Sequence, residues 1–487
     1  MSLIPLIFRT ARTSAHEGWQ RFWLARDRFL ADHMRRRGTG FPFATYRTPA
    51  LAEPIELALA PEDLRHHALV LGSTGSGKSS LLELLARAAL TQRQGLALLD
   101  LHGDLYLRTA AWALDAPHRD LILLDFTQPA LLPSWNPLQR LPDVDPGRQV
   151  DLLIGVLKRL YADEVAASWA WGVKVEEILR QTLRALIEST RPTTLLDLAP
   201  FLLVPAVRWS ILASASPETR SYFLTRFGAR EQMYVSAVLN KMDPFLGSLA
   251  VQRFLGQPAS TVDLMGCLTP RTVLLVNLAK GYLGPTAEVL GRLILNVLAL
   301  AALRRTTQPI SARTPFALLL DEAHALAGPE SGLEALLVAA RKFRVSVSLA
   351  AQSLSLFPPR SRPHLLGNTA RQYLFRLPMS EARLLAPDAF EPLGSVYRPA
   401  IRPTDTLEDP LLTPAEEERA FTKEMANLPT GACIWVSKTR RYKGRRIQVH
   451  PPPDLPWTHG VLLKRLEERM LARKRPPAGD DRGDVPF

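Results

Sequence analysis

The chain contains very little cysteine. Among its 487 residues only Cys267 and Cys433 are cysteines, and they are far apart in the sequence. Neither has histidine or cysteine neighbours at the spacing of metal ligands. This pattern excludes a disulfide framework and a zinc-finger type of site, and it favours a reducing cytosol.

The chain also lacks an uninterrupted apolar run of the ~20 residues that a transmembrane helix needs. Its longest apolar stretch, residues 287–303, contains Glu288, Arg292 and Asn296, so we expect a buried helix there. Residues 1–8 are apolar but short and have no small-residue cleavage site, so we do not expect a signal peptide. A cytoplasmic location, or a peripheral one at the inner face of the cell membrane, fits these observations.

Acidic residues are in deficit. The 60 Lys+Arg exceed the 47 Asp+Glu, which gives a formal net charge of +13. Such an excess favours an anionic partner, either nucleic acid or an acidic membrane surface. A general bias of the composition toward arginine would produce the same net charge without any such partner.

An amphipathic helix is predicted over residues 14–38, where aromatic and aliphatic side chains recur at helical spacing before Arg35, Arg36 and Arg37. Arg26 interrupts the apolar stripe. A face of this kind packs on its own domain or on a neighbouring subunit, or it lies on an anionic membrane.

Short, almost wholly apolar runs alternate with helical segments after residue 67. The runs cover residues 68–71, 96–99, 121–124, 273–276, 317–320 and 345–349. Runs of this length are typical of strands in a parallel sheet that is covered on both faces. The alternation predicts an α/β fold of the RecA-like P-loop type with a mostly parallel sheet.

The strand pattern disappears between residues 148 and 257, where the apolar residues have a helical period. This predicts an all-α insertion in the α/β core. A helix with a capping box at Thr413 and Glu416 and two strands near 433–436 and 446–449 are predicted later in the chain. The predicted segments are an N-terminal helix and linker (1–60), the first part of the core (61–147), the insertion (148–257), the second part of the core (258–455), and a basic helix with a disordered tail (456–487).

Residues 72–79 match the pattern G-x-x-x-x-G-K-[ST] directly after a predicted strand and at the start of a predicted helix. In this context the glycines let backbone N–H groups surround the phosphates of ATP. Lys78 reaches the β- and γ-phosphates, and Ser79 ligates Mg²⁺. The predicted nucleotide-binding residues are Gly72, Ser73, Thr74, Gly75, Ser76, Gly77, Lys78, Ser79 and Ser80.

A second half of an ATP site is predicted at residues 316–322, an apolar strand that ends in Asp321 and Glu322. Asp321 is expected to hold Mg²⁺ through water, and Glu322 to polarise the attacking water. The letters D-E-A-H at 321–324 also occur in a helicase class. Those helicases keep the two motifs close and carry a Q-x-x-G-R-x-G-R element, which is missing here, so we interpret His324 as incidental.

Three further polar segments follow predicted strands or helices. Gln352 lies at the carboxyl end of the strand at 345–351, where it senses the γ-phosphate or is an ordinary loop residue. Arg341 follows a short helix and acts as an arginine finger on a neighbouring subunit, or is a solvated helix-end arginine. Asp100 opens the turn 100–104, which contacts Mg²⁺ or phosphate, or only shapes the turn.

The ordered set of these motifs resembles the HerA/FtsK superfamily, and most closely its conjugative coupling proteins and type IV secretion-type ATPases. The turn Asp100-Leu-His-Gly-Asp104 resembles the family's D-P-H-G-D, with leucine in place of proline. Trp135-Asn-Pro-Leu138 resembles its N-P-L element, and residues 276–284 and 366–376 resemble two further elements. The similarity covers roughly residues 65–455.

This resemblance implies a ring, usually a hexamer, that pumps double-stranded DNA without sequence preference, with ATP at the subunit interfaces. It implies that Arg341 is a trans-acting finger and Gln352 a sensor. A membrane or secretion-apparatus partner and a nuclease or relaxase are the other expected partners. Two rival hypotheses stay open: a type IV secretion-assembly ATPase acting on protein, and a nucleotide-gated scaffold that recruits a nuclease or relaxase.

Overall fold

The structure is a computed structural model, and it describes residues 40–47, 53–116, 119–140, 144–160, 172–327, 332–391, 412–438 and 442–474. The helix predicted at 14–38 and the tail predicted after residue 474 lie outside these residues. The chain divides into two compact units. The first unit comprises residues 1–92 and 346–453, and the second comprises residues 93–345 and 454–487.

The first unit contains a mixed sheet with the strand order β2-β1-β11-β10-β9-β3-β8. Strand β3 runs parallel to β8 and β9, whereas the pairs from β9 through β10, β11 and β1 to β2 are antiparallel. Its strands are β1 (Phe41–Tyr46), β2 (Ile55–Leu59), β3 (Ala68–Leu71), β8 (Val345–Ala351, starting at the boundary), β9 (Arg371–Leu374), β10 (Ala432–Ser437) and β11 (Tyr442–Val449).

The helices of the first unit are short. They are η1 (Asp63–Arg65), α2 (Lys78–Thr91), η8 (Leu354–Leu356), α16 (Arg362–Asn368), α17 (Met379–Ala389) and α18 (Pro414–Ala426). The capping box predicted for α18 is confirmed. The hydroxyl of Thr413 accepts from the backbone N–H of Glu416 (3.3 Å), and the carboxylate of Glu416 accepts from the backbone N–H of Thr413 (2.9 Å).

The sequence analysis assigned residues 1–60 to a helix and linker. This is wrong for the residues that form the strands β1 and β2. Both strands are short, and β1 contains a proline at position 42 and an irregular register next to it. Strand β1 is stabilised by antiparallel pairing with β11, which lies about four hundred residues further along the chain, as in the register Ala44↔Val449, and β2 pairs in turn with β1. The sequence pattern around residues 41–59 therefore does not reveal the strand with which β1 pairs.

The second unit contains a wholly parallel set of strands in the order β7-β4-β6-β5. All four were predicted, and nearly every residue in them is buried, as expected for strands covered on both faces. The strands are β4 (Gly95–Asp100), β5 (Asp120–Asp125), β6 (Thr272–Asn277) and β7 (Phe316–Leu320).

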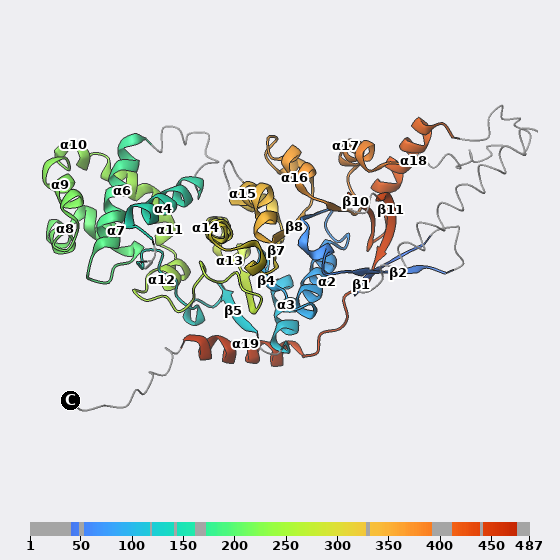
Figure 1. The fold of residues 1–487 in the computed structure, drawn as a ribbon, viewed down its shortest axis with the longest axis horizontal. Coiled ribbons are helices and arrows are strands. Elements are labelled where there is room, and N and C mark those ends of the chain that lie inside the picture. Colours follow the sequence, from blue (N-terminus) through green and yellow to red (C-terminus); the bar gives the residue numbers. More distant parts are fainter. Residues whose placement is uncertain are drawn as a thin grey trace, which may run out of the picture. The chain divides into compact units, whose positions relative to one another are not determined.

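Helices make up most of the second unit (Figure 1). Among the described residues between β5 and β6, all the regular elements are helical, which confirms the predicted insertion. Before and within the insertion lie α3 (Asp104–Leu114), η2 (Pro129–Leu131), α4 (Pro146–Leu160), α6 (Val173–Glu188), η3 (Leu195–Asp197), α7 (Leu198–Leu203), α8 (Pro205–Leu212), α9 (Pro217–Thr225), α10 (Ala229–Gln232), α11 (Val235–Leu246) and α12 (Leu249–Leu255). After it come α13 (Lys280–Leu283), α14 (Pro285–Arg304), η4 (Arg305–Thr307), η5 (Ile310–Ala312), η6 (Ala323–Leu326), α15 (Gly332–Ala339), η7 (Ala340–Phe343) and α19 (His459–Lys474).

Helix α14 contains the longest apolar stretch of the chain. The segment 285–307 is long and apolar enough to cross a membrane, but 67% of its most apolar window is buried within the protein. Its residues include Asn296, whose side-chain oxygen accepts from the backbone N–H of Gly332 at the start of α15 (2.9 Å). The buried helix expected from the sequence is therefore observed.

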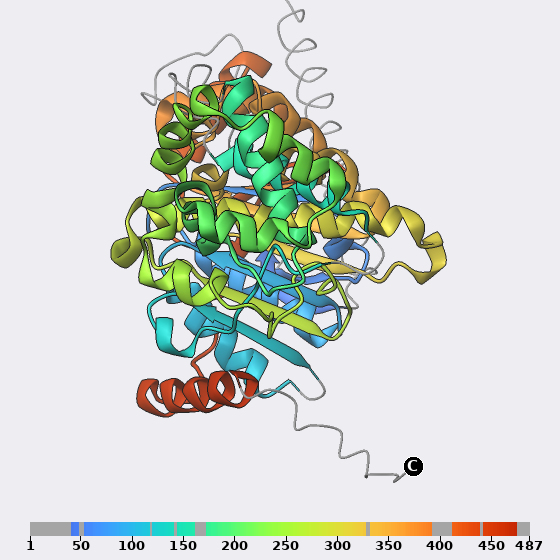
Figure 2. The same ribbon diagram turned by 90° about the vertical axis from the view of Figure 1, so that its left-hand side faces the viewer.

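Helix α19 packs against η2. It lies next to β5 in Figure 1 and is the red helix in the turned view of Figure 2. Leu462, Leu466 and Met470 recur every four residues and are buried, so one narrow stripe of the helix packs on the unit. The guanidinium of Arg473 donates to Asp120 at the start of β5. This helix covers the edge strand of the parallel set.

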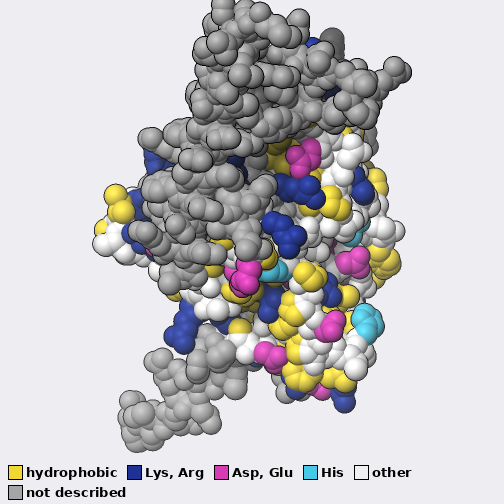
Figure 3. All heavy atoms as spheres, turned by 90° about the vertical axis from the view of Figure 1, so that its right-hand side faces the viewer, with side chains coloured by type: hydrophobic (Ala, Val, Ile, Leu, Met, Phe, Trp, Pro, Cys, Tyr) yellow, Lys and Arg dark blue, Asp and Glu magenta, His cyan; other side chains and the backbone are white. Residues whose placement is uncertain are grey.

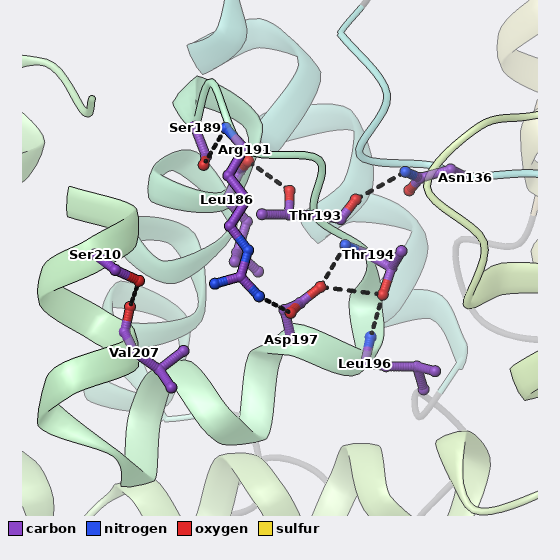
Figure 4. Close-up of polar contacts among 10 residues, drawn as sticks. All are labelled: Asn136, Leu186, Ser189, Arg191, Thr193, Thr194, Leu196, Asp197, Val207 and Ser210. Atoms are coloured by element: carbon purple, nitrogen blue, oxygen red, sulfur yellow. Dashed lines mark hydrogen bonds and ion pairs between the residues drawn. The ribbon is translucent and has the colours of Figure 1, made fainter. Parts of the chain in front are cut away.

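Asn136, which is 4% exposed, makes a hydrogen bond to the helical insertion. Its side-chain amide donates to the carbonyls of Thr193 (2.8 Å) and Pro258 (2.9 Å), and its side-chain oxygen accepts from the backbone N–H of Leu138 (3.0 Å). Figure 4 shows the first of these contacts next to Thr194, whose hydroxyl and backbone N–H face the carboxylate of Asp197. Asn136, which precedes the insertion, is thus bonded to a residue within it and to the residue directly after it.

Replacing Asn136 with alanine is expected to destabilise the second unit by about 2–4 kcal/mol, because two buried carbonyls and one N–H lose their partner. Hydrogen exchange of the amides in 193–198, together with a thermal melt, measures the effect. Asn240→Ala, at an exposed position of α11, is the control and should stay within about 0.5 kcal/mol of the parent. Equal protection in both variants would contradict this role of Asn136.

Candidate active site

Residues 72–77 form a loop between β3 and α2 in the first unit (Figure 1). The backbone N–H of Gly72 donates to Ala351 at the end of β8 (3.3 Å), and that of Ser73 donates to the carbonyl of Arg376 (2.8 Å). The backbone N–H of Ser76 closes a turn to the carbonyl of Ser73 (3.2 Å). Gly75 and Gly77 have φ angles of +71° and +116°, the left-handed region that favours glycine.

Two glycines of this loop are also required by close packing. A Cβ at Gly72 would lie 2.6 Å from the Cβ of Phe375, and one at Gly77 would lie 3.1 Å from the Phe375 ring and 3.2 Å from Gly431. Phe375 follows β9, and Gly431 precedes β10. The neighbouring strands therefore support the loop from one side.

Lys78 begins α2, and its side chain folds back over the loop. Its Nζ donates to the carbonyl of Ser73 (3.2 Å), and the residue is 7% exposed. The next residue, Ser79, is exposed. The N-terminus of α2 and the ammonium group of Lys78 thus lie together at the loop, as the chemistry of phosphate binding requires.

Gln352 lies beside this loop. Strands β3 and β8 are parallel neighbours with Leu71 opposite Ala351, so Gly72 and Gln352 both follow the last paired residues at the same sheet edge. Gln352 is exposed. Within the first unit, the structure therefore brings together the residues 72–80 and Gln352.

Asp321 and Glu322 lie in the second unit, at the carboxyl end of β7. The backbone N–H of Asp321 donates to Leu99 of β4 (3.1 Å), and its carboxylate accepts from the backbone N–H of Glu322 (3.1 Å). Asp321 is 7% exposed. Glu322 has φ +47° and ψ +46°, a left-handed conformation that costs a glutamate of the order of 1–3 kcal/mol and is typical of functional positions.

The turn at Asp100 has a structural role. One carboxylate oxygen of Asp100 accepts from the backbone N–H of His102 (2.8 Å), and the other accepts from that of Tyr106 (2.8 Å). Both oxygens are thus engaged in shaping the turn and the first turn of α3. Of the two roles left open by the sequence, the turn role is the one that these contacts support.

The neighbouring strand ends carry a second polar pair. Asp125 accepts from the side-chain amide of Asn277 (2.9 Å) and from the backbone N–H of Thr127 (3.0 Å). Burial and the charge of Asp125 raise the pKa of Tyr106 well above its usual value, so this phenol stays neutral. The sequence analysis did not single out Asp125, because one polar residue at a strand end is too common a pattern, and it included Asn277 only within the element 276–284 and gave it no role.

Arg341 lies in η7, directly after α15 in the second unit, and its side chain is exposed. The sequence analysis placed it after a short helix, and this is confirmed. An exposed guanidinium can reach a second copy of the chain. Its action on such a copy stays a prediction.

The described residues contain no group of three or more His, Cys, Asp or Glu side chains that could hold a metal ion by themselves. The hydroxyl of Ser79 in the first unit is exposed, and the carboxylate of Asp321 in the second unit is largely buried. Each is an oxygen donor of the kind that Mg²⁺ takes in proteins.

The turn at Thr430 and Gly431 was missed by the sequence analysis. The backbone N–H of Gly431 donates to the carbonyl of Ser76 (2.9 Å), and the hydroxyl of Thr430 donates to that of Gly75 (3.4 Å). These contacts hold the outer part of the phosphate-binding loop. The only local signal is a Pro-Thr-Gly turn before a predicted strand, which does not reveal its partner.

A cavity of about 410 Å³ lies elsewhere in the second unit. It is lined by α4, α14 and the segments 135–140 and 260–265. Its walls include Trp135, Leu153 and Val297, with Arg140 and Asp263 among the polar lining residues. None of the predicted site residues lines it.

Comparison with known proteins gives both a family model and similar structures. The model of the central domain of the helicase HerA matches residues 50–122. A search of curated proteins gives no significant match.

Three similar solved structures cover most of the chain. The unbound bacterial conjugative coupling protein TrwBdeltaN70 is 18% identical over 88% of this chain and 94% of its own, with a TM-score of 0.59. The plasmid coupling protein TrwB in complex with ADP and Mg²⁺ is 17% identical over 82% and 88%, with a TM-score of 0.57. VirB4 of Thermoanaerobacter pseudethanolicus is 14% identical over 85% and 97%, with a TM-score of 0.52.

At these identities the likeness concerns the fold, and it confirms the RecA-like α/β fold with its helical insertion. The family match covers the phosphate-binding loop that the sequence motif predicted. A role of Asp321 and Glu322 toward a nucleotide stays a prediction. The chain therefore has the fold of the conjugative coupling protein TrwB, and its residues 50–122, with the phosphate-binding loop, match the model of the HerA central domain.

Proposed function

We propose that this chain is the ATP- and Mg²⁺-dependent motor of a ring that moves double-stranded DNA in DNA transfer, conjugation or defence. The observation that carries the proposal is the phosphate-binding loop with Gln352 beside it, in a chain with the fold of a conjugative coupling protein. The plasmid coupling protein TrwB, which has this fold, is known in complex with ADP and Mg²⁺ and with a non-hydrolysable ATP analogue.

In the nucleotide complex, the residues 72–80 would surround the phosphates with backbone N–H groups, and Lys78 would neutralise the β- and γ-phosphates. Ser79 and, through water, Asp321 would hold Mg²⁺. The bound ion supplies charge neutralisation on the phosphates. The folded-back position of Lys78 over the loop keeps its ammonium group close to the place where this charge arrives.

For hydrolysis, Glu322 would polarise and orient the attacking water, and Gln352 would report the γ-phosphate. Arg341, which is exposed, would stabilise the transition state on a neighbouring subunit. Hydrolysis would then require a homo-oligomer, which we propose to be a hexamer. One chain would contribute Glu322 to its own site and Arg341 to the next.

A DNA pump needs contacts to phosphates rather than to bases. The net charge of +13 supplies a long-range attraction to such a polymer. Among the described side chains visible on the face in Figure 3, Lys and Arg lie interspersed with acidic and hydrophobic residues. DNA binding should therefore be independent of sequence and weaken with salt.

We place the motor in the cytoplasm or at the inner face of the cell membrane, with a secretion apparatus, a nuclease or a relaxase as its partner. The likeness to VirB4 favours a second candidate, an assembly ATPase of type IV secretion that acts on protein. A nucleotide-gated scaffold is a third. Dependence of ATP turnover on DNA separates the first candidate from the other two.

Long duplex DNA is expected to stimulate ATP turnover of the purified protein about tenfold or more at low salt, and moderate salt should abolish the stimulation because phosphate contacts are lost. Glu322→Gln should bind ATP normally and lose about 10²-fold or more in turnover, because its amide cannot accept a proton from water. A coupled steady-state ATPase assay measures both effects. Turnover that ignores DNA in an assembled ring would favour the protein-assembly candidate.

Lys78→Ala is expected to weaken ATP binding by about 10- to 100-fold, because a charge-assisted contact worth about 1.5–3 kcal/mol is lost. Titration with a fluorescent ATP analogue measures the affinity directly, without hydrolysis. Lys464→Ala, which removes an exposed lysine of α19, is the control for charge alone. An affinity equal to that of the parent would remove Lys78 from the site.

Arg341→Ala is expected to lower turnover about 10³-fold without weakening ATP binding. The neighbouring exposed Lys342 gives a matched control, Lys342→Ala, which should remain active. Mixing Arg341→Ala with Glu322→Gln should restore roughly a quarter of the parental turnover, because about one interface in four then has both residues intact. No recovery in mixed rings would show that Arg341 does not act across the interface.

A further inference from the structure

Glu322 and His324 face each other after the end of β7. The Nδ1 atom of His324 lies 3.3 Å from a carboxylate oxygen of Glu322, and their side chains are 24% and 12% exposed. The interpretation of His324 as incidental does not account for this contact. A half-buried imidazole beside the carboxylate that is expected to act on water can influence the reaction.

The contact depends on the local backbone. Glu322 adopts the left-handed conformation, and its carbonyl accepts from the backbone N–H of Ala325 (3.0 Å) within the turn η6. The guanidinium of Arg292, from α14, donates to the carbonyl of Ala325 (3.3 Å) and holds the same turn from outside. Such a strained conformation persists only where the surroundings over-determine it.

The surroundings of His324 favour a neutral ring. Burial lowers the pKa of His324, Glu322 and Glu288 act in the opposite direction, and Lys280 adds to the lowering. Lys280 and Glu288 form an ion pair of 2.7 Å. A neutral imidazole has one N–H, and a carboxylate only accepts, so a hydrogen bond between the two requires the proton on Nδ1.

We propose that His324 is a positioning residue for Glu322: its Nδ1–H holds one carboxylate oxygen in the nucleotide complex and thereby orients Glu322 toward the attacking water. This inference rests on the proposed function of Glu322. At 3.3 Å and in their present orientation, these two atoms are in contact but do not form a hydrogen bond. Hydrogen bonds of catalytic groups are commonly long before the substrate binds and shorten in the reacting complex.

A role in positioning differs from a role in packing by its kinetic signature. A residue that only packs would change the stability of the turn and would leave the turnover of the folded enzyme unchanged. A residue that orients Glu322 lowers kcat, while the affinity for ATP, which depends on the residues of the phosphate-binding loop, stays the same.

Two amide substitutions separate the two ring nitrogens. In His324→Asn the amide nitrogen can occupy the place of Nδ1, whereas in His324→Gln it lies near the place of Nε2. His324→Ala is expected to lower kcat about tenfold with KM for ATP changed less than about twofold. His324→Asn should recover to within about threefold of the parent, and His324→Gln should resemble the alanine variant.

The assay is steady-state ATP turnover of the full chain with duplex DNA, with binding of a fluorescent ATP analogue measured on each variant. Glu322→Gln and the double variant are assayed in parallel. If His324 acts through Glu322, His324→Ala should not reduce the residual turnover of Glu322→Gln further. The analogue titration shows that each variant is folded and binds nucleotide.

An inactive Glu322→Gln together with a fully active His324→Ala would overturn this inference and leave the proposed function standing. A fully active Glu322→Gln would overturn the role of Glu322 and that of His324 with it. Equal loss in the asparagine, glutamine and alanine variants would also overturn the assignment of Nδ1, because the position of the donor would then not matter.

Discussion

The chemistry of this protein depends on one constraint, the burial of its parallel strands. Leu71 of β3, Leu320 of β7 and Ala351 of β8 are all fully buried. Polar side chains cannot be placed within such strands at low cost, so they are found where the strands end. The next residues along the chain are Gly72 and Gln352 in the first unit and Asp321 in the second, and each is a predicted site residue. Within the first unit, the parallel pairing of β3 with β8 brings Gly72 and Gln352 to the same end of the strands.

The antiparallel part of the first unit contributes to the site through packing. The backbone of the phosphate-binding loop is hydrogen-bonded to Ala351 at the end of β8, to Arg376 after β9 and to Gly431 in the turn before β10. Phe375 leaves no space for a Cβ at Gly72, whereas Gly77 is closely packed by Phe375 and Gly431 and also has a positive φ angle. A loop that must expose several N–H groups to phosphate needs such outside support, because those groups are not available to hold it.

The sequence allowed the parallel strands, the buried helix α14, the helical insertion and the capping box at Thr413 to be predicted, because each of these has a local pattern. Strands β1 and β2 were missed because β1 pairs with β11, which is remote in the sequence, and β2 depends on its pairing with β1. The role of Asp100 could not be decided from its motif, because a carboxylate at a strand end serves a turn or an ion equally well. Only its bonds to His102 and Tyr106 distinguish the two. His324 was interpreted as incidental for a related reason. Its contact with Glu322 depends on the left-handed backbone conformation of Glu322, and a glutamate in the sequence does not predict that conformation.

Glu322 and Arg341 belong to the same unit but differ in exposure, and this difference bears on how assembly would control turnover. Glu322 is largely buried beside His324, so its orientation is set within its own chain. Arg341 is exposed on a short turn, and a solvated guanidinium stabilises little by itself. It gains strength where a neighbouring chain excludes water around it, since the same charges interact more strongly at low dielectric. An isolated chain would thus hold the residue that orients water but lack the environment in which the cation is effective, and ring formation would supply that environment.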